Sequence, residues 1–333
     1  MLLFLAGVVE QLDLALEHLN KGDTHNARFG LMLTDNALEL VLHQIAKDKR
    51  SDAAGWRFRE TPYAHEAKAK KAFLGRFPDK IAFAKLDGGL DAETARTFDI
   101  LHDYRNDVYH AGLAHEQILH TLALFYFKET CDFVGRYRSF GIGWGSANKM
   151  PERAQKYFTG HDKFMPGKQE DYPAACATLA AASGHDPKTL INVLADDVER
   201  IADYMDTCLQ IVADGVYVGQ QVSRDQAIRD TQAWDIAFED AGKAFLRSRE
   251  FKGSVLAAVN LIAAEYPFKI RRDPVPGWQE KAKKLRRGSN PHVTLDHYQA
   301  FITQTASLRA AIEQSAGAAE AEIEAASDRM RGR

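Results

Sequence analysis

The chain is organised around the stretch Tyr104-Arg105-Asn106-Asp107-Val108-Tyr109-His110-Ala111-Gly112. A run with helical periodicity, residues 92–103, precedes this stretch, and a second run, residues 113–137, follows it. The second run is apolar on nearly all sides, which is typical of a helix at the centre of a bundle or in a dimer interface. Gly112 is typical of a helix C-terminus, so the pattern predicts two packed helices with a bend between them.

Arg105 and His110 suit chemistry on a phosphodiester. Histidine titrates near neutral pH and transfers protons, whereas the planar arginine guanidinium stays charged and matches a pair of phosphate oxygens. Asn106 and His110 are four residues apart and share a helix face, but Arg105 and His110 are five apart and are separated by about 140°. Either Arg105 reaches around the helix, or the helix ends near Gly112, or the working pair comes from two chains.

Arg105, Asn106 and His110 resemble the signature of the HEPN superfamily. In that signature an arginine, often followed by Asn, Asp or His, precedes a histidine by a short spacer between two helices. The resemblance covers residues 1–140. It implies an N-terminal HEPN-like helical bundle, and it implies metal-independent cleavage of RNA, without a cofactor, by a homodimer that forms through this domain.

The resemblance also implies a role for each residue of the motif. His110 takes the proton of the RNA 2′-hydroxyl or protonates the 5′ leaving oxygen, and Arg105 stabilises the charge on the phosphoryl oxygens. Asn106 orients His110 or donates to a phosphate. The products are a 2′,3′-cyclic phosphate and a 5′-hydroxyl.

The cellular role that the resemblance implies is prokaryotic antiphage defence or a toxin–antitoxin system, with an antitoxin or defence protein as partner. Toxins of this superfamily that nucleotidyltransferases silence carry Tyr two residues after the motif histidine. Gly112 occupies that place here, which argues against control by adenylylation. The alternative function is a non-catalytic HEPN-like scaffold or a nucleotide- or protein-binding module, in which a buried Arg–Asn–His cluster ties helices together.

Two carboxylates, Asp35 and Glu39, lie on one face near the middle of a predicted helix, residues 26–47. We expect them to be exposed to solvent. The alternative is that a carboxylate here orients Arg105 across the bundle.

A basic stretch, residues 47–76, holds nine Lys and Arg residues against four Asp and Glu residues, interleaved with Trp56, Phe58 and Tyr63. Such a pattern suits a path for single-stranded RNA, because bases stack on aromatic rings while basic side chains follow the phosphates. The alternative is a solvated surface whose aromatic residues anchor it to the core. The predicted RNA-binding residues are Arg57, Arg59, Lys68, Lys70 and Lys71.

At 333 residues the chain is long enough for two domains. Glycine and proline punctuate residues 141–187, which we interpret as a connection with one or two short helices. A second helical domain with a partner-binding, sensing or dimerising role follows at residues 188–333. It contains another basic stretch, residues 269–287, with eight Lys and Arg residues, which could bind a nucleic-acid backbone or be a solvated surface.

Composition limits the other classes of function. The net charge is −3, so nucleic-acid binding must be local, and 45% hydrophobic with 27% charged residues is typical of a soluble globular protein. Three widely spaced cysteines without a C-x-x-C pattern indicate a reducing, cytoplasmic setting and no thiolate metal site. Residues 2–9 are apolar but lack the basic flank of a signal peptide, and no run is long enough to span a membrane.

Overall fold

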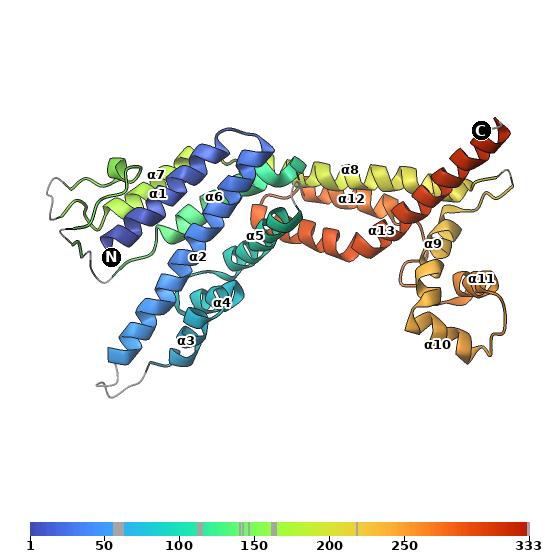
Figure 1. The fold of residues 1–333 in the computed structure, drawn as a ribbon, viewed down its shortest axis with the longest axis horizontal. Coiled ribbons are helices and arrows are strands. Elements are labelled where there is room, and N and C mark those ends of the chain that lie inside the picture. The colour runs from blue at the N-terminus through green and yellow to red at the C-terminus, as the bar shows by residue number, and fades with distance from the viewer. Residues whose placement is uncertain are drawn as a thin grey trace. The chain divides into compact units, whose positions relative to one another are not determined.

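The computed structural model describes residues 1–55, 63–111, 116–139, 141, 143–145, 147–160, 165–217 and 219–331, without the side chains of 53–55 and 109–111. The described residues form thirteen α-helices and one short 3-10 helix, with no strand among them (Figure 1). The predicted all-α fold is therefore confirmed. None of the described helices is long and apolar enough to cross a membrane.

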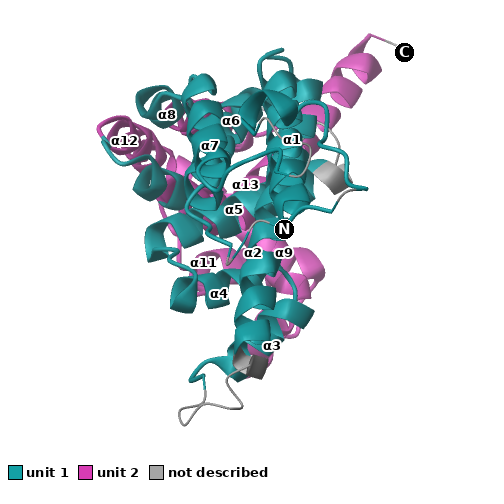
Figure 2. Cartoon of the chain, turned by 90° about the vertical axis from the view of Figure 1, so that its left-hand side faces the viewer, with its two compact units in different colours: residues 1–193, 288–296 teal, residues 194–287, 297–333 magenta. Residues whose placement is uncertain are grey.

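The chain divides into two compact units (Figure 2). Unit 1 comprises residues 1–193 and 288–296, and unit 2 comprises residues 194–287 and 297–333. These limits do not coincide with the domain boundaries predicted at residues 140 and 188. That residues 1–140 and 188–333 are separate domains remains a prediction.

Four helices that pack against one another form the core of unit 1 (Figure 1). They are α1 (Leu2–Leu19), α2 (Thr24–Gly55), α6 (Glu116–Val134) and α7 (Asp171–Ala182). Leu5, Val8 and Leu12, which recur at helical spacing along α1, are buried. The helix α6 is buried on nearly every side, with Leu119, Leu122 and Phe125 at 0% exposed. The predicted connection therefore supplies one of the core helices, because α7 packs on both α1 and α6.

Three further helices cover one side of α2, namely α3 (Glu66–Leu74), α4 (Phe77–Asp87) and α5 (Ala92–Ala111). The sequence of residues 64–77 predicts a single helix, but the chain is extended at Gly75 and Arg76 and a new helix begins at Phe77. Pro78 explains the new start, since its fixed φ suits a first turn and it has no N–H to continue the preceding helix. The helix α5 is longer than expected, and its backbone stays helical through the motif to Ala111.

Unit 2 contains a group of three short helices, α9 (Arg224–Phe238), α10 (Asp240–Ser248) and α11 (Val255–Glu265). The apolar periodicity of residues 224–249 predicts one helix, but the backbone is extended at Glu239 and divides it into two. At this junction Gly242 comes so close to the Ile236 carbonyl that a Cβ atom would lie 1.9 Å from the oxygen. Ala233, Val259 and Ile262 belong to the small core that holds the group together.

The other helices are α8 (Pro187–Asp214), α12 (Val275–Arg286) and α13 (Pro291–Met330), and the unit boundaries fall within α8 and α13. Within unit 2, Tyr298 donates a hydrogen bond of 2.7 Å to Asp197, which joins α13 to α8. Arg286 pairs with Asp196 at 2.5 Å, and Trp278 is buried. The second basic stretch thus lies largely on α12, and these two of its residues are engaged within the protein.

Candidate functional site

Asp35 lies in the middle of α2 and is completely buried, at 0% exposed. Its Oδ1 atom accepts a 2.6 Å hydrogen bond from the Tyr126 hydroxyl and lies 2.8 Å from His102 Nδ1. Its Oδ2 atom lies 3.2 Å from Arg105 Nε. The expected solvent exposure of Asp35 is therefore wrong, and its contacts are those of the alternative, a carboxylate that holds Arg105 across the bundle.

The burial of this carboxylate has a physical explanation. A buried charge is costly unless it is paired and hydrogen-bonded, and Asp35 has three donor groups around it, from α5 and α6. Burial and the nearby Asp35 charge raise the pKa of Tyr126 well above its ordinary value, so the phenol stays a neutral donor. Glu39, one turn further along α2, pairs instead with the buried Lys80 of α4, at 2.9 Å.

Arg105 is positioned from two sides. Its Nη1 atom donates a 2.9 Å hydrogen bond to Asn106 Oδ1, and Nε meets the Asp35 carboxylate as an ion pair without an aligned hydrogen bond. The side chain remains 31% exposed, so a phosphate can approach the guanidinium. Arg28 of α2 donates a 3.1 Å hydrogen bond to the Val108 carbonyl in the last turns of α5, and so places a second cation beside the motif.

His110 lies on the helical backbone of α5, but its side chain is outside the described residues, as is Gly112. The helix continues at least to Ala111, so Arg105 and His110 keep the angular separation of about 140° that a helix imposes. The pair therefore requires either a reach around the helix or a second chain.

His102 is a candidate functional residue that the sequence interpretation missed. Its ring stacks on Phe77 with 3.9 Å between ring centroids and 1° between ring planes, while Nδ1 faces Asp35. His102 lies three residues before Arg105 and four before Asn106, so the three side chains share one face of α5. That spacing is present in the sequence, but the contact of His102 with the buried Asp35 carboxylate is evident only from the structure.

The predicted RNA-binding residues have separate outcomes. Lys68, Lys70 and Lys71 are exposed on α3, whereas Arg57 and Arg59 lie outside the described residues, as do Trp56 and Phe58. Lys68, Lys71 and Lys85 line a hollow of about 400 Å³ between α3 and α4, in which Lys71 pairs with Asp79 at 2.7 Å. The Tyr63 hydroxyl donates to Asp87, so this ring is anchored to the protein.

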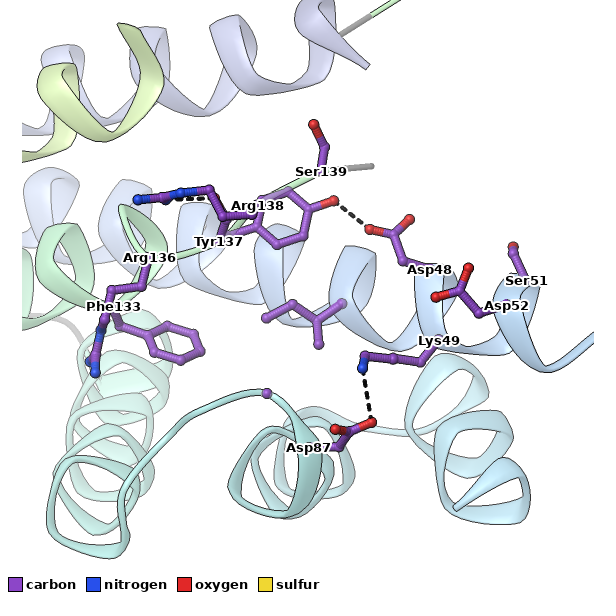
Figure 3. Close-up of a pocket in the computed structure, with 12 residues that line it drawn as sticks. Asp48, Lys49, Ser51, Asp52, Asp87, Phe133, Arg136, Tyr137, Arg138 and Ser139 are labelled. Carbon is purple, nitrogen blue, oxygen red and sulfur yellow. Dashed lines mark hydrogen bonds and ion pairs between the residues drawn. The ribbon is translucent and has the colours of Figure 1, made fainter. Parts of the chain in front are cut away.

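A larger hollow, of about 540 Å³, lies between the second half of α2, the end of α4 and the chain that follows α6 (Figure 3). Charged groups of both signs line this hollow. Asp48 and Asp52 come from α2 and Asp87 from the end of α4, while Arg136 and Arg138 follow α6.

Neighbouring residues hold the carboxylates of this hollow in place. Asp48 accepts a hydrogen bond from Tyr137, and Asp87 pairs with Lys49 at 3.2 Å (Figure 3). Asp87 also accepts a hydrogen bond from Tyr63. Burial opposes ionisation of Asp87, but the donors outweigh it and lower the pKa of its carboxyl. The Asp87 carboxyl is therefore charged at neutral pH.

Within the described residues, no three His, Cys, Asp or Glu side chains gather closely enough to hold a metal ion. Comparison of the chain with protein-family models, with curated proteins and with solved structures found no match. The resemblance to the HEPN superfamily therefore rests on the motif and its setting on α5.

Proposed function

We propose that the chain is a metal-independent endoribonuclease of the HEPN type, in which Arg105, Asn106 and His110 act on RNA. The 2′-hydroxyl attacks the adjacent phosphorus, and the products carry a 2′,3′-cyclic phosphate and a 5′-hydroxyl. The observation that carries the proposal is the buried Asp35 carboxylate, 3.2 Å from Arg105 Nε. A protein that only needed a surface cation would not require a buried counter-ion to hold the guanidinium at one angle, whereas stabilising a phosphoryl transition state does.

The experiment is cleavage of a synthetic RNA in the presence of EDTA. Wild-type protein should cut the RNA and leave cyclic phosphate ends, and a single 2′-deoxy substitution should block the cut at that position. Arg105→Gln should lose the activity, by about 100-fold or more, because a transition-state contact is removed. Arg96→Ala is the matched control, since it removes another arginine of α5 whose ion pair with Asp296 is exposed. Equal cleavage by Arg105→Gln and the wild type would refute the proposal.

We further propose that the enzyme works as a homodimer, in which His110 of one chain serves with Arg105 of the other. This arrangement accounts for the separation of the two residues around α5. A mixture of Arg105→Gln and His110→Gln chains should then regain about a quarter of the wild-type sites, because half of the dimers carry one intact pair. No recovery in a mixture shown to exchange subunits would contradict the shared site.

In this proposal the cell needs the activity held in check, as in a toxin–antitoxin pair or an antiphage system with a partner protein. Expression of the wild-type chain should slow bacterial growth, and Arg105→Gln should relieve the effect. The exposed lysines Lys68, Lys70 and Lys71 would lead the RNA backbone along α3, and their replacement by Gln should reduce the salt dependence of RNA binding.

The second candidate is a nucleotide-binding module, and the hollow of Figure 3 favours it. Arg136 and Arg138 would take phosphate oxygens, Asp48 and Asp52 would accept from ribose hydroxyls, and Phe133 would support the base. Thermal unfolding with a series of nucleotides tests this candidate. A rise in melting temperature that Arg136→Ala abolishes, in a chain without RNA cleavage, would favour the module over the enzyme.

A further inference from the structure

We infer that His102 is a second catalytic residue, the base that takes the proton from the 2′-hydroxyl; this inference rests on the proposed RNA cleavage. His102, Arg105 and Asn106 share one face of α5, and Asp35 contacts both His102 and Arg105. One buried carboxylate thus fixes the spacing between an imidazole and a guanidinium of the same chain.

The contact with Asp35 sets the tautomer of His102. An ionised carboxylate only accepts hydrogen bonds, so the 2.8 Å contact places the proton of a neutral ring on Nδ1. Nε2, on the other edge of the ring, then carries the lone pair that can accept a proton. A carboxylate that orients a histidine base through Nδ1 is a recurrent arrangement in general-base catalysis.

The ring is also held in one orientation. Phe77 covers one face of the imidazole at 3.9 Å with parallel planes, and Asp35 is itself held by Tyr126. The side chain of His102 is nevertheless 16% exposed. Since Nδ1 faces Asp35, Nε2 lies on the edge of the ring away from that carboxylate.

The proposed step balances in atoms and protons. Nε2 of His102 takes the 2′-hydroxyl proton while the 2′ oxygen forms a bond to phosphorus and the bond from phosphorus to the 5′ oxygen breaks. Arg105 stabilises the charge on the phosphoryl oxygens. The 5′ oxygen takes a proton from the imidazolium of His110, and exchange with water restores both histidines. Of the two roles open to His110, this assignment selects the acid.

His102→Asn tests the inference, because the asparagine amide can take the place of Nδ1–H and still donate to Asp35, yet has no nitrogen that titrates near neutral pH. We expect kcat on the synthetic RNA to fall by about 100-fold or more with KM little changed, and the acidic limb of the pH profile of kcat/KM to disappear. His120→Gln is the matched control, since His120 Nε2 contacts the Leu19 carbonyl at 2.9 Å within the same bundle and has no assigned role.

A second variant distinguishes the loss of a catalytic base from a folding defect. His102→Ala leaves a space beside Phe77, and added imidazole should restore part of its rate if the missing group is a base.

The outcomes separate this inference from the proposed function. Cleavage that requires Arg105 but keeps its rate and pH profile in His102→Asn would overturn the inference and leave the nuclease standing. A lower rate with the acidic limb intact, and no rescue by imidazole, would reduce His102 to a structural residue and overturn the inference as well. Absence of cleavage by the wild-type chain would overturn the proposed function itself.

Discussion

Replacing Asp35 by alanine should destabilise unit 1 by about 3 kcal/mol, and the magnitude follows from the three partners of the carboxylate. The Tyr126 hydroxyl is completely buried and would lose its acceptor, which costs about 1–3 kcal/mol. His102 is 16% exposed, and the loss of its contact with Asp35 would cost about 1 kcal/mol of stability. Arg105, at 31% exposed, would rehydrate and add less than about 1 kcal/mol.

Urea unfolding followed by circular dichroism measures this loss, and hydrogen exchange of peptides from α5 assigns the transition to unit 1. Glu17→Ala is the control, since Glu17 pairs with Arg153 on the surface at 47% exposed and its loss should leave the urea midpoint nearly unchanged. The double variant Asp35→Ala with Tyr126→Phe should recover about 1 kcal/mol, because the orphaned hydroxyl is gone. A cost below about 1 kcal/mol for Asp35→Ala, or no recovery in the double variant, would refute the reasoning.

Three further predictions concern other parts of the fold. Gly242→Ala should destabilise unit 2 by about 2 kcal/mol or more, since the new Cβ would lie 1.9 Å from the Ile236 carbonyl oxygen. Hydrogen exchange around the junction of α9 and α10 should become faster. Unchanged exchange there would contradict the close approach of Gly242 to Ile236. Burial, reinforced by the charge of Lys128, lowers the pKa of His185 from 6.5 to about 4. As the pH falls, the unfolded chain therefore binds a proton at this residue before the folded chain does. The free energy of unfolding of unit 1 should decrease by up to about 3 kcal/mol between pH 6.5 and pH 4. His185→Gln should flatten that dependence in urea titrations at several pH values, and an unchanged slope would assign it to other groups. Ser254→Ala should lower the free energy of unfolding by about 1 kcal/mol, as measured by thermal unfolding, because the serine hydroxyl caps the N-terminus of α11. Ser254→Asp should retain the stability of the wild type, since Asp also caps helices.

Helices with one continuous apolar stripe could be predicted from the sequence. The apolar residues that recur at helical spacing on α1 are buried, and α6 is buried on nearly all sides. Such helices can be predicted because periodicity depends only on the nearest residues along the chain. The breaks between α3 and α4 and between α9 and α10 were missed. In both cases the apolar period continues across the break. Pro78 begins a new helix after the first break, and at the second the backbone is extended at Glu239 and Gly242 packs closely against the Ile236 carbonyl.

The environment of Asp35 could not be predicted in this way. On α2 alone, a carboxylate near Glu39 looks like part of a solvated face. Its burial depends on His102, which is 67 residues away in the sequence, and on Tyr126, which is 91 residues away. The motif itself was found because Arg105, Asn106 and His110 are close in sequence, whereas the groups that hold Arg105 in place come together only through the packing of α2, α5 and α6.

The contacts of Asp35 with His102 and Arg105 also determine which catalytic group has to come from a second chain. If the base is His102, the base and the cation belong to one chain and keep their spacing whether or not a second chain is bound, because the same carboxylate contacts both. Only the acid, His110, then has to come from elsewhere around the helix or from a partner. A chain that dissociates would keep the group that activates the 2′-hydroxyl but lose the group that protonates the leaving oxygen. The alkaline limb of the pH profile, and not the acidic one, should therefore depend on protein concentration.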